Sequence, residues 1–234
     1  MKHSNLLTLF LPLLLSLLLL APTANAGLIT VSLGNTAPGF VDGSTPALIP
    51  DLVGAQGGQD APFDQGYGAD GLFGGSFDQN WTFNYAAIAT TITNATITIG
   101  IADHDSSASG SQVGDFSLDG MGSALLTAAL DTAFEASGGA TDGQFKVYTL
   151  NIDNSLFGEL ADGSVTTALR LSGPGLVPDI FNGGFAESVN NGAFLIYSSL
   201  NITFEDPSNP PSVPEPSTLL LVVLSLAGLK ARIK

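Results

Sequence analysis

Short segments in which apolar and polar residues alternate are the feature that most constrains the fold of this chain. The clearest is 95–101, Ala-Thr-Ile-Thr-Ile-Gly-Ile, which places its isoleucines on one face of a strand and its threonines on the other. Clusters of Gly, Asn, Asp and Ser separate such segments, a pattern typical of all-β sandwiches and barrels. Further strands are predicted at 28–33, 81–85, 115–119, 145–152, 165–171 and 194–204.

One helix is predicted among these strands. In 123–134, Leu126, Leu130 and Phe134 recur every four residues and fall on one helical face. Residues 34–80 hold eleven glycines in 47 positions and predict long loops with a few short strands. The expected fold is therefore mainly β, an antiparallel, jelly-roll-like sandwich over 27–204 with one short helix.

The N-terminal residues 1–26 have the pattern of a secretory signal. Lys2 precedes an almost unbroken apolar run, and Ala24 and Ala26 form an A-x-A cleavage site for signal peptidase. We expect cleavage to leave Gly27 as the first residue. The alternative is a membrane helix that is retained.

The C-terminal residues differ equally from the middle. The spacer 205–216 holds five prolines in twelve residues, which favours a stiff, extended segment. The apolar segment 217–229 follows, and as a helix its thirteen residues would span roughly 20 Å, short of a hydrocarbon core of ~30 Å. The basic residues of 230–234 are expected to stay on the cytoplasmic side of the membrane.

This end resembles the PEP-CTERM sorting signal of Gram-negative bacteria. Pro214, Glu215 and Pro216 match its signature, and the apolar and basic parts of 214–234 follow in the family's order. The resemblance implies cleavage near this motif by an exosortase, a membrane-embedded cysteine transpeptidase, and so only transient membrane insertion. The protein would then be released or re-anchored at the cell surface or in the matrix. The alternative is a tail anchor that is left uncut.

The middle of the chain is similar in style to uncharacterised domains of such proteins. The similarity covers roughly 78–204 and is carried by 99–106 (with Asp103-His104-Asp105-Ser106), by Leu118-Asp119-Gly120 and by Asn191-Gly192-Ala193. It implies a β-sandwich fold and a location outside the cell, and it assigns no activity to the chain.

Charge and cysteine content exclude several classes of function. All 21 acidic residues lie between 27 and 216, where Lys146 and Arg170 are the only basic residues, so this region carries a formal charge of −19. Phosphate-rich partners would be repelled, which excludes nucleic acid. The absence of cysteine excludes disulfides and thiolate chemistry.

An acidic cluster predicts a structural calcium ion, the one cofactor that the sequence suggests. Asp103 and Asp105 end one predicted strand, and Asp115 and Asp119 lie on the next. If the two strands formed a hairpin, their carboxylates would converge and supply the oxygen ligands that calcium needs. The alternative is a solvated hairpin whose like charges stay apart.

The sequence favours a protein that is not an enzyme. His104, the only histidine after the signal, is expected to be an exposed loop residue, protonated between its aspartate neighbours. No serine elbow or metallohydrolase set accompanies it. Paired carboxylates remain an alternative route to a glycan hydrolase or lyase.

Aromatic and threonine residues suggest two kinds of binding surface. Trp81 shares a strand face with Phe83 and Tyr85 and is expected in the core, which leaves Tyr67 as the predicted exposed glycan contact. Threonine pairs at 91/93 and 96/98 match, in part, the arrays of ice-binding proteins. The expected function is thus a surface or matrix protein associated with exopolysaccharide in biofilm. A calcium-stabilised carbohydrate-binding module, a glycan hydrolase or lyase and an ice-binding protein are the alternatives.

Overall fold

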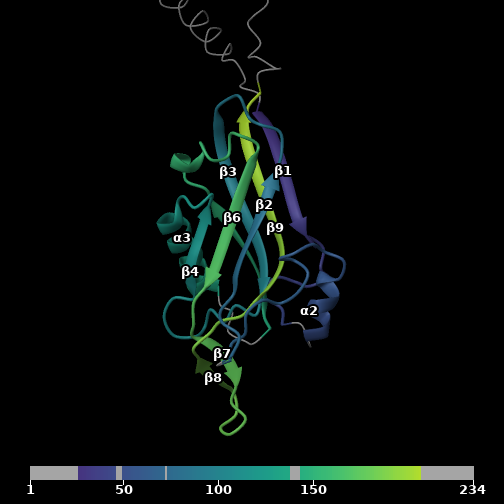
Figure 1. Ribbon diagram of the computed structural model, residues 1–234, viewed down its shortest axis with the longest axis vertical. Helices are drawn as coiled ribbons and strands as arrows, with labels where there is room; N and C mark the ends of the chain where they lie inside the picture. The colour runs from purple at the N-terminus through teal and green to yellow at the C-terminus, as the bar shows by residue number, and fades with distance from the viewer. Residues whose placement is uncertain (1–25, 46–48, 72, 138–142, 207–234) are drawn as a thin grey trace, which may run out of the picture. The chain divides into compact units, whose positions relative to one another are not determined.

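Two antiparallel β-sheets form the body of the computed structural model, which describes residues 26–45, 49–71, 73–137 and 143–206. One sheet has the strand order β1-β9-β3-β5 and the other β2-β6-β4 (Figure 1). The strands are β1 Ala26–Gly34, β2 Asp78–Asn84, β3 Ile92–Ala102, β4 Val113–Leu118, β5 Phe145–Asn151, β6 Ser164–Leu171 and β9 Phe194–Glu205. The antiparallel, mainly β fold that the alternation predicted is confirmed.

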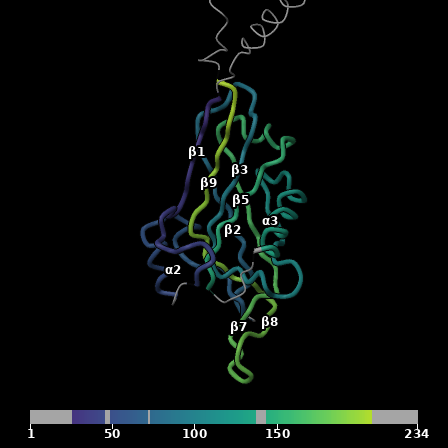
Figure 2. Tube along the Cα trace, turned by 180° about the vertical axis from the view of Figure 1, so that it is seen from behind, coloured from purple at the N-terminus to yellow at the C-terminus, as the bar shows by residue number. Residues whose placement is uncertain are grey.

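Along the chain, the strands of the two sheets alternate between one sheet and the other. β1, β3, β5 and β9 belong to the four-stranded sheet, and β2, β4 and β6 belong to the other. Each connection between these strands therefore passes from one sheet to the other, and the connection from β6 to β9 includes the separate pair β7 and β8. Figure 2 shows the four strands of the larger sheet side by side.

The core fills the space between the inner faces of these sheets. Ile97, Ile99 and Ile101 of β3 are buried in it, whereas Thr96 and Thr98 between them point outward and keep partial exposure. Phe116 of β4 and Leu169 of β6 enter the same cluster from the opposite sheet. Burial thus alternates along β3 from one residue to the next, as the apolar and polar residues do in the sequence.

Helix α3, Ser123–Ser137, closes one side of the sandwich. It packs against β4 and β5, the edge strands of the two sheets. Leu126, Leu130 and Phe134 are its buried residues in the core, so the predicted helix and its apolar face are confirmed.

Four elements were not predicted as such. Helix α2, Ile49–Gln56, lies within the segment expected to form loops and buries Leu52 in a small second cluster with Phe145 and Ile196. A 3-10 turn, η1 Asn154–Leu156, follows β5. Strands β7 Gly175–Pro178 and β8 Phe185–Ser188 form a separate hairpin.

The predicted signal and sorting segments lie largely outside the described residues. This holds for the expected signal helix and for the helix expected over 217–229. Ala26, at the predicted cleavage site, is the first residue of β1. Within the described ranges, neither helix combines the length and the apolar character needed to cross a membrane.

Candidate functional site

The four aspartates predicted to bind calcium do not form one cluster. β3 and β4 belong to different sheets, so the segment between them is a crossover and not the expected hairpin. Asp103 and Asp105 follow the end of β3, whereas Asp119 lies beyond the far end of β4. In the part of the chain that the structure describes, no three His, Cys, Asp or Glu side chains gather in a metal-binding arrangement. Calcium binding stays a prediction, but these four aspartates do not form a common site for the ion.

Each of these carboxylates instead accepts a hydrogen bond nearby. Asp103 accepts from the backbone N–H of Gly143 at 2.6 Å, Asp105 from that of Leu176 at 2.7 Å and Asp119 from that of Thr166 at 2.8 Å; Asp115 accepts from the hydroxyls of Ser117 and Ser123. Asp103, Asp105 and Asp119 also adopt positive φ angles of 59°, 49° and 48°. Aspartate tolerates this left-handed conformation better than most residues. The three aspartates with positive φ therefore shape turns and tie them to neighbouring backbone.

His104 lies fully buried in the core, which contradicts the expected exposed and protonated loop residue. Its Nε2 lies 2.7 Å from the hydroxyl of Tyr148, and its ring meets Phe134 edge-on at a centroid distance of 4.4 Å. Nδ1 is buried without a hydrogen-bond partner. Burial, and to a lesser extent the charge of Lys146, lowers the pKa of His104 to about 3. Desolvation thus outweighs the neighbouring carboxylates that favoured protonation in the sequence.

This buried imidazole predicts acid sensitivity. Between the unfolded pKa of 6.5 and the folded pKa of about 3, the unfolded chain binds a proton that the folded chain does not, so the free energy of unfolding falls as pH falls through that window. We expect a loss of about 2 kcal/mol between pH 7 and pH 5 from this group. Urea unfolding at both pH values measures it.

The matched variant for this test is His104→Gln, which stays neutral at both pH values. Its loss between pH 7 and pH 5 should be smaller than that of the native chain by about 2 kcal/mol. Equal losses in the two proteins would show that His104 does not titrate differently in the folded and unfolded chains.

Two of the motifs that suggested a family, 99–106 and 191–193, meet in this part of the molecule. The buried side chain of Asn191 donates to the carbonyl of His104 at 2.9 Å. The backbone of Gly192 comes so close to Ala69 that a Cβ would lie 2.9 Å from its nitrogen. These residues serve a buried polar junction between the loop after β3 and the start of β9.

Of the two aromatic residues whose exposure was predicted, Trp81 agrees with the prediction and Tyr67 is less exposed than expected. Trp81 is buried and meets Phe63 edge-on, which confirms its place in the core. Tyr67, the predicted glycan contact, is only partly exposed, because its ring packs edge-on against Phe77. Its hydroxyl donates to Asp64 at 2.8 Å, and partial burial together with this bond raises the pKa of Tyr67.

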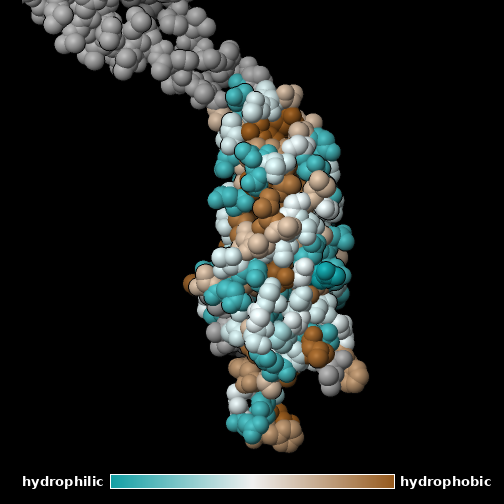
Figure 3. Space-filling model, turned by 90° about the vertical axis from the view of Figure 1, so that its left-hand side faces the viewer, coloured by the Kyte–Doolittle hydropathy of each residue, from teal (hydrophilic) through white to brown (hydrophobic). Residues whose placement is uncertain are grey.

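Exposed apolar side chains lie instead at the tip of the β7–β8 hairpin. Ile180 and Phe181 are 83% and 89% exposed, and Figure 3 shows apolar side chains at this tip, at the lower end of the view. Asp179 holds the turn by accepting from the backbone N–H groups of Phe181 and Asn182, both at 3.0 Å. This feature was not predicted from the sequence, although Asn182-Gly-Gly after two bulky residues is a turn signal that could have revealed it.

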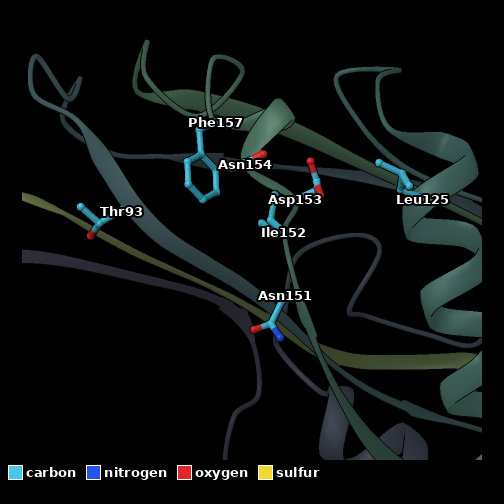
Figure 4. A pocket seen from close by; sticks show the side chains of 7 residues that line it. All are labelled: Thr93, Leu125, Asn151, Ile152, Asp153, Asn154 and Phe157. Carbon is cyan, nitrogen blue, oxygen red and sulfur yellow. The ribbon is translucent and has the colours of Figure 1, made fainter.

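A pocket of about 450 Å³ opens beside the end of β5. It is lined by Thr93, Leu125, Asn151, Ile152, Asp153, Asn154 and Phe157. Figure 4 shows Phe157 and Thr93 on one side of Ile152, and Leu125 of α3 on the other. Hydrogen bonds from the Ser155 hydroxyl and backbone lower the pKa of Asp153, which is therefore a fixed anion at neutral pH. The pocket thus places amide, carboxylate and aromatic groups side by side.

The outer face of the larger sheet carries eight hydroxyl and amide side chains in two cross-strand rows. The first row is Thr30, Asn201, Thr96 and Asn151, and the second is Ser32, Ser199, Thr98 and Thr149. We call this set the hydroxyl–amide face. Of the predicted threonines, 96 and 98 belong to it.

The outer face of the smaller sheet is different in charge. Arg170 of β6 lies directly opposite Asp78 on one side and Asp115 on the other. These three residues, with Ala168 and Leu169, line a pocket of about 300 Å³. Two carboxylates therefore share one pocket, which is the arrangement that the glycan-hydrolase alternative requires. Arg170 lies on the strand between theirs.

Comparisons with known proteins identify the C-terminal segment. Residues 212–234 match the family model of the PEP-CTERM protein-sorting motif, which confirms the resemblance seen at Pro214, Glu215 and Pro216. The motif directs bacterial proteins through export to an exosortase and the cell surface. No curated protein matches the chain. A solved structure, dimeric latent PorU from Porphyromonas gingivalis, aligns over 79% of this chain and 14% of its own length, with 8% identity and a TM-score of 0.35.

Proposed function

We propose that this chain, an exported protein with a PEP-CTERM sorting motif, is a non-enzymatic component of the bacterial surface or extracellular matrix that associates with exopolysaccharide. The sorting motif supports its delivery to the cell surface. Signal peptidase and exosortase would be its partners only during export, and exopolysaccharide its lasting one.

The observation that carries the proposal is that the ionisable residues singled out in the sequence as candidate site residues have structural roles. His104 lies neutral in the core, and Asp103, Asp105 and Asp119 accept backbone hydrogen bonds. General acid–base work needs groups that reach a substrate. His104 instead packs in the core and the three aspartates stabilise turns, which supports a protein that acts through its surface.

A carbohydrate-binding module is the second candidate. The pocket beside β5 favours it, because Phe157 offers an apolar ring next to Asn151, Asn154 and the anionic Asp153. Such a module would recognise a specific sugar unit. A matrix component would need only broad affinity for a polymer.

A glycan hydrolase would use Asp78 and Asp115, which line the pocket on the smaller sheet. These residues lie on β2 and β4 with β6 between them, so their backbones are two strand spacings, or roughly 10 Å, apart. Asp115 already accepts from two serine hydroxyls. We therefore favour the matrix role and the carbohydrate-binding module over glycan hydrolysis.

A deletion strain tests the proposed function. Loss of the chain should reduce the polysaccharide that stays with washed cells and weaken flocs or biofilm, and a plasmid copy of the full gene should restore both. The Asp115→Asn variant should restore them as well as the native chain does. Unchanged matrix in the deletion strain, or failure of the Asp115→Asn copy alone, would contradict a non-enzymatic matrix role.

A further inference from the structure

The hydroxyl–amide face is ordered before any ligand arrives. The Thr30 hydroxyl donates to Asn201 at 2.7 Å, and the hydroxyls of Ser32 and Ser199 lie 2.7 Å apart. Across the sheet, the hydroxyls of Thr98 and Thr149 lie 2.9 Å apart. Each hydroxyl still has hydrogen-bonding capacity left over, since a hydroxyl offers one donor and two acceptor sites. A preformed array loses little side-chain entropy on binding.

The face is also regular. Its members lie opposite one another on four hydrogen-bonded strands, so neighbours across the sheet are ~4.8 Å apart and the two rows ~7 Å apart. These spacings are comparable to the length of one sugar unit. A flat, repeating set of neutral donors and acceptors therefore suits a polymer whose own hydroxyls repeat.

Charge decides which polymer fits. None of the eight side chains is charged, although the region 27–216 carries a formal charge of −19. A polyanionic polysaccharide would be repelled by this field. A neutral polysaccharide meets no such repulsion and exchanges hydrogen bonds with water for hydrogen bonds with the face.

An aromatic ring borders the array. Gly100 of β3 lies between Tyr197 and Val147 in the next row, and a Cβ at Gly100 would collide with the Tyr197 ring. The glycine thus lets the Tyr197 ring lie over β3 at Gly100, which is in the row next to that of Thr98. Tyr197 stays partly exposed, and a ring of this kind offers an apolar surface with a polar edge, as sugars require.

We propose that the hydroxyl–amide face, with Tyr197 at its border, is the binding surface for an extended neutral polysaccharide. This inference rests on the proposed function and names its surface and its ligand class. It also separates this surface from the pocket of Figure 4, which meets it only at Asn151.

The chain offers a closely matched pair of variants for the test. Thr98→Val with Thr149→Val removes one cross-strand hydroxyl pair from the face and keeps the shape and the β-branched side chains. Thr82→Val with Thr166→Val removes a pair with the same 2.9 Å separation from the smaller sheet. Each double variant removes two hydroxyl groups from an exposed sheet surface, so general effects on folding should be alike.

The measurement is retention of the exported full-chain product in gels that contain amorphous cellulose, agarose or polygalacturonate. We expect retention by at least one neutral polymer and none by polygalacturonate. Loss of the Thr98/Thr149 pair should weaken it about tenfold, and loss of the Thr82/Thr166 pair less than twofold. No retention by either neutral polymer, or equal effects of the two double variants, would overturn the inference. The inference would also be overturned if the face controlled ice growth while the protein was not retained by either neutral polysaccharide.

Its failure can be told apart from failure of the proposed function. If the Thr98/Thr149 variant fully restores the matrix of the deletion strain, the matrix role stands and this surface does not. If the deletion strain has normal matrix while the gel result holds, the face binds polysaccharide and the matrix role fails.

Discussion

Replacing Pro214, Glu215 and Pro216 by alanine is expected to keep most of the chain in the cell envelope with its C-terminal tail uncut. These residues form the matched sorting motif, and the apolar and basic parts of 217–234 follow them. A hydrophobic tail that is not removed holds a protein at the membrane. Immunoblots of membrane, surface and medium fractions would show the shift, with a larger mass for the retained chain.

The matched control lies a few residues upstream. Pro210 and Pro211 belong to the same Pro-rich spacer but precede the matched segment 212–234. Their replacement by alanine should leave mass and location unchanged. Normal processing of the triple variant, or equal retention of the control, would show that this motif does not direct sorting.

Phe134→Ala is expected to cost about 3–5 kcal/mol of folding free energy, a large part of the 5–15 kcal/mol typical of a domain. Phe134 is fully buried and packs against His104 and against Tyr148, at a ring distance of 4.7 Å. It thereby fixes α3 to the core at the edge of the sandwich. Urea unfolding of the exported chain measures the loss.

Leu125→Ala is its control on the same helix. Leu125 is 54% exposed, so its truncation should change the free energy of unfolding by no more than about 0.5 kcal/mol. Phe134→Ala should also raise the pKa of His104, because water would reach the ring. Comparable losses for the two variants would contradict the packing of α3 described above.

The strands of both sheets followed from the sequence because each has one buried face. Alternation in 95–101 and 194–204 located β3 and β9 to within a few residues. The period of four in Leu126, Leu130 and Phe134 located α3 for the same reason. What the alternation could not reveal is which sheet a strand joins.

That gap explains the error about the four aspartates. A hairpin and a crossover have the same local sequence pattern, and here the connection is a crossover that places β3 and β4 in different sheets. Asp119, at the far end of β4, would lie away from Asp103 in either arrangement. His104 was misplaced for a related reason. Polar neighbours on both sides suggested exposure, whereas the turn at Asp103 and Asp105 directs the ring inward against α3.

The remaining elements carry weak local signals. Helix α2 has only eight residues, among them Pro50 and Gly54, and packing of Leu52 on the larger sheet supports it. The hydroxyl–amide face joins side chains up to 171 positions apart, such as Thr30 and Asn201, so no local window contains it. Register between distant strands creates such surfaces, and register comes from the whole sheet.

Mass spectrometry of the chain recovered from washed extracellular polysaccharide of the producing strain distinguishes a sorted matrix protein from one retained in the membrane. We expect a chain that begins at Gly27, ends near the Pro214–Pro216 motif and stays with the polysaccharide fraction. A chain that keeps residues 217–234 and is found in the membrane, with none in the polysaccharide, would refute both the sorting and the matrix role.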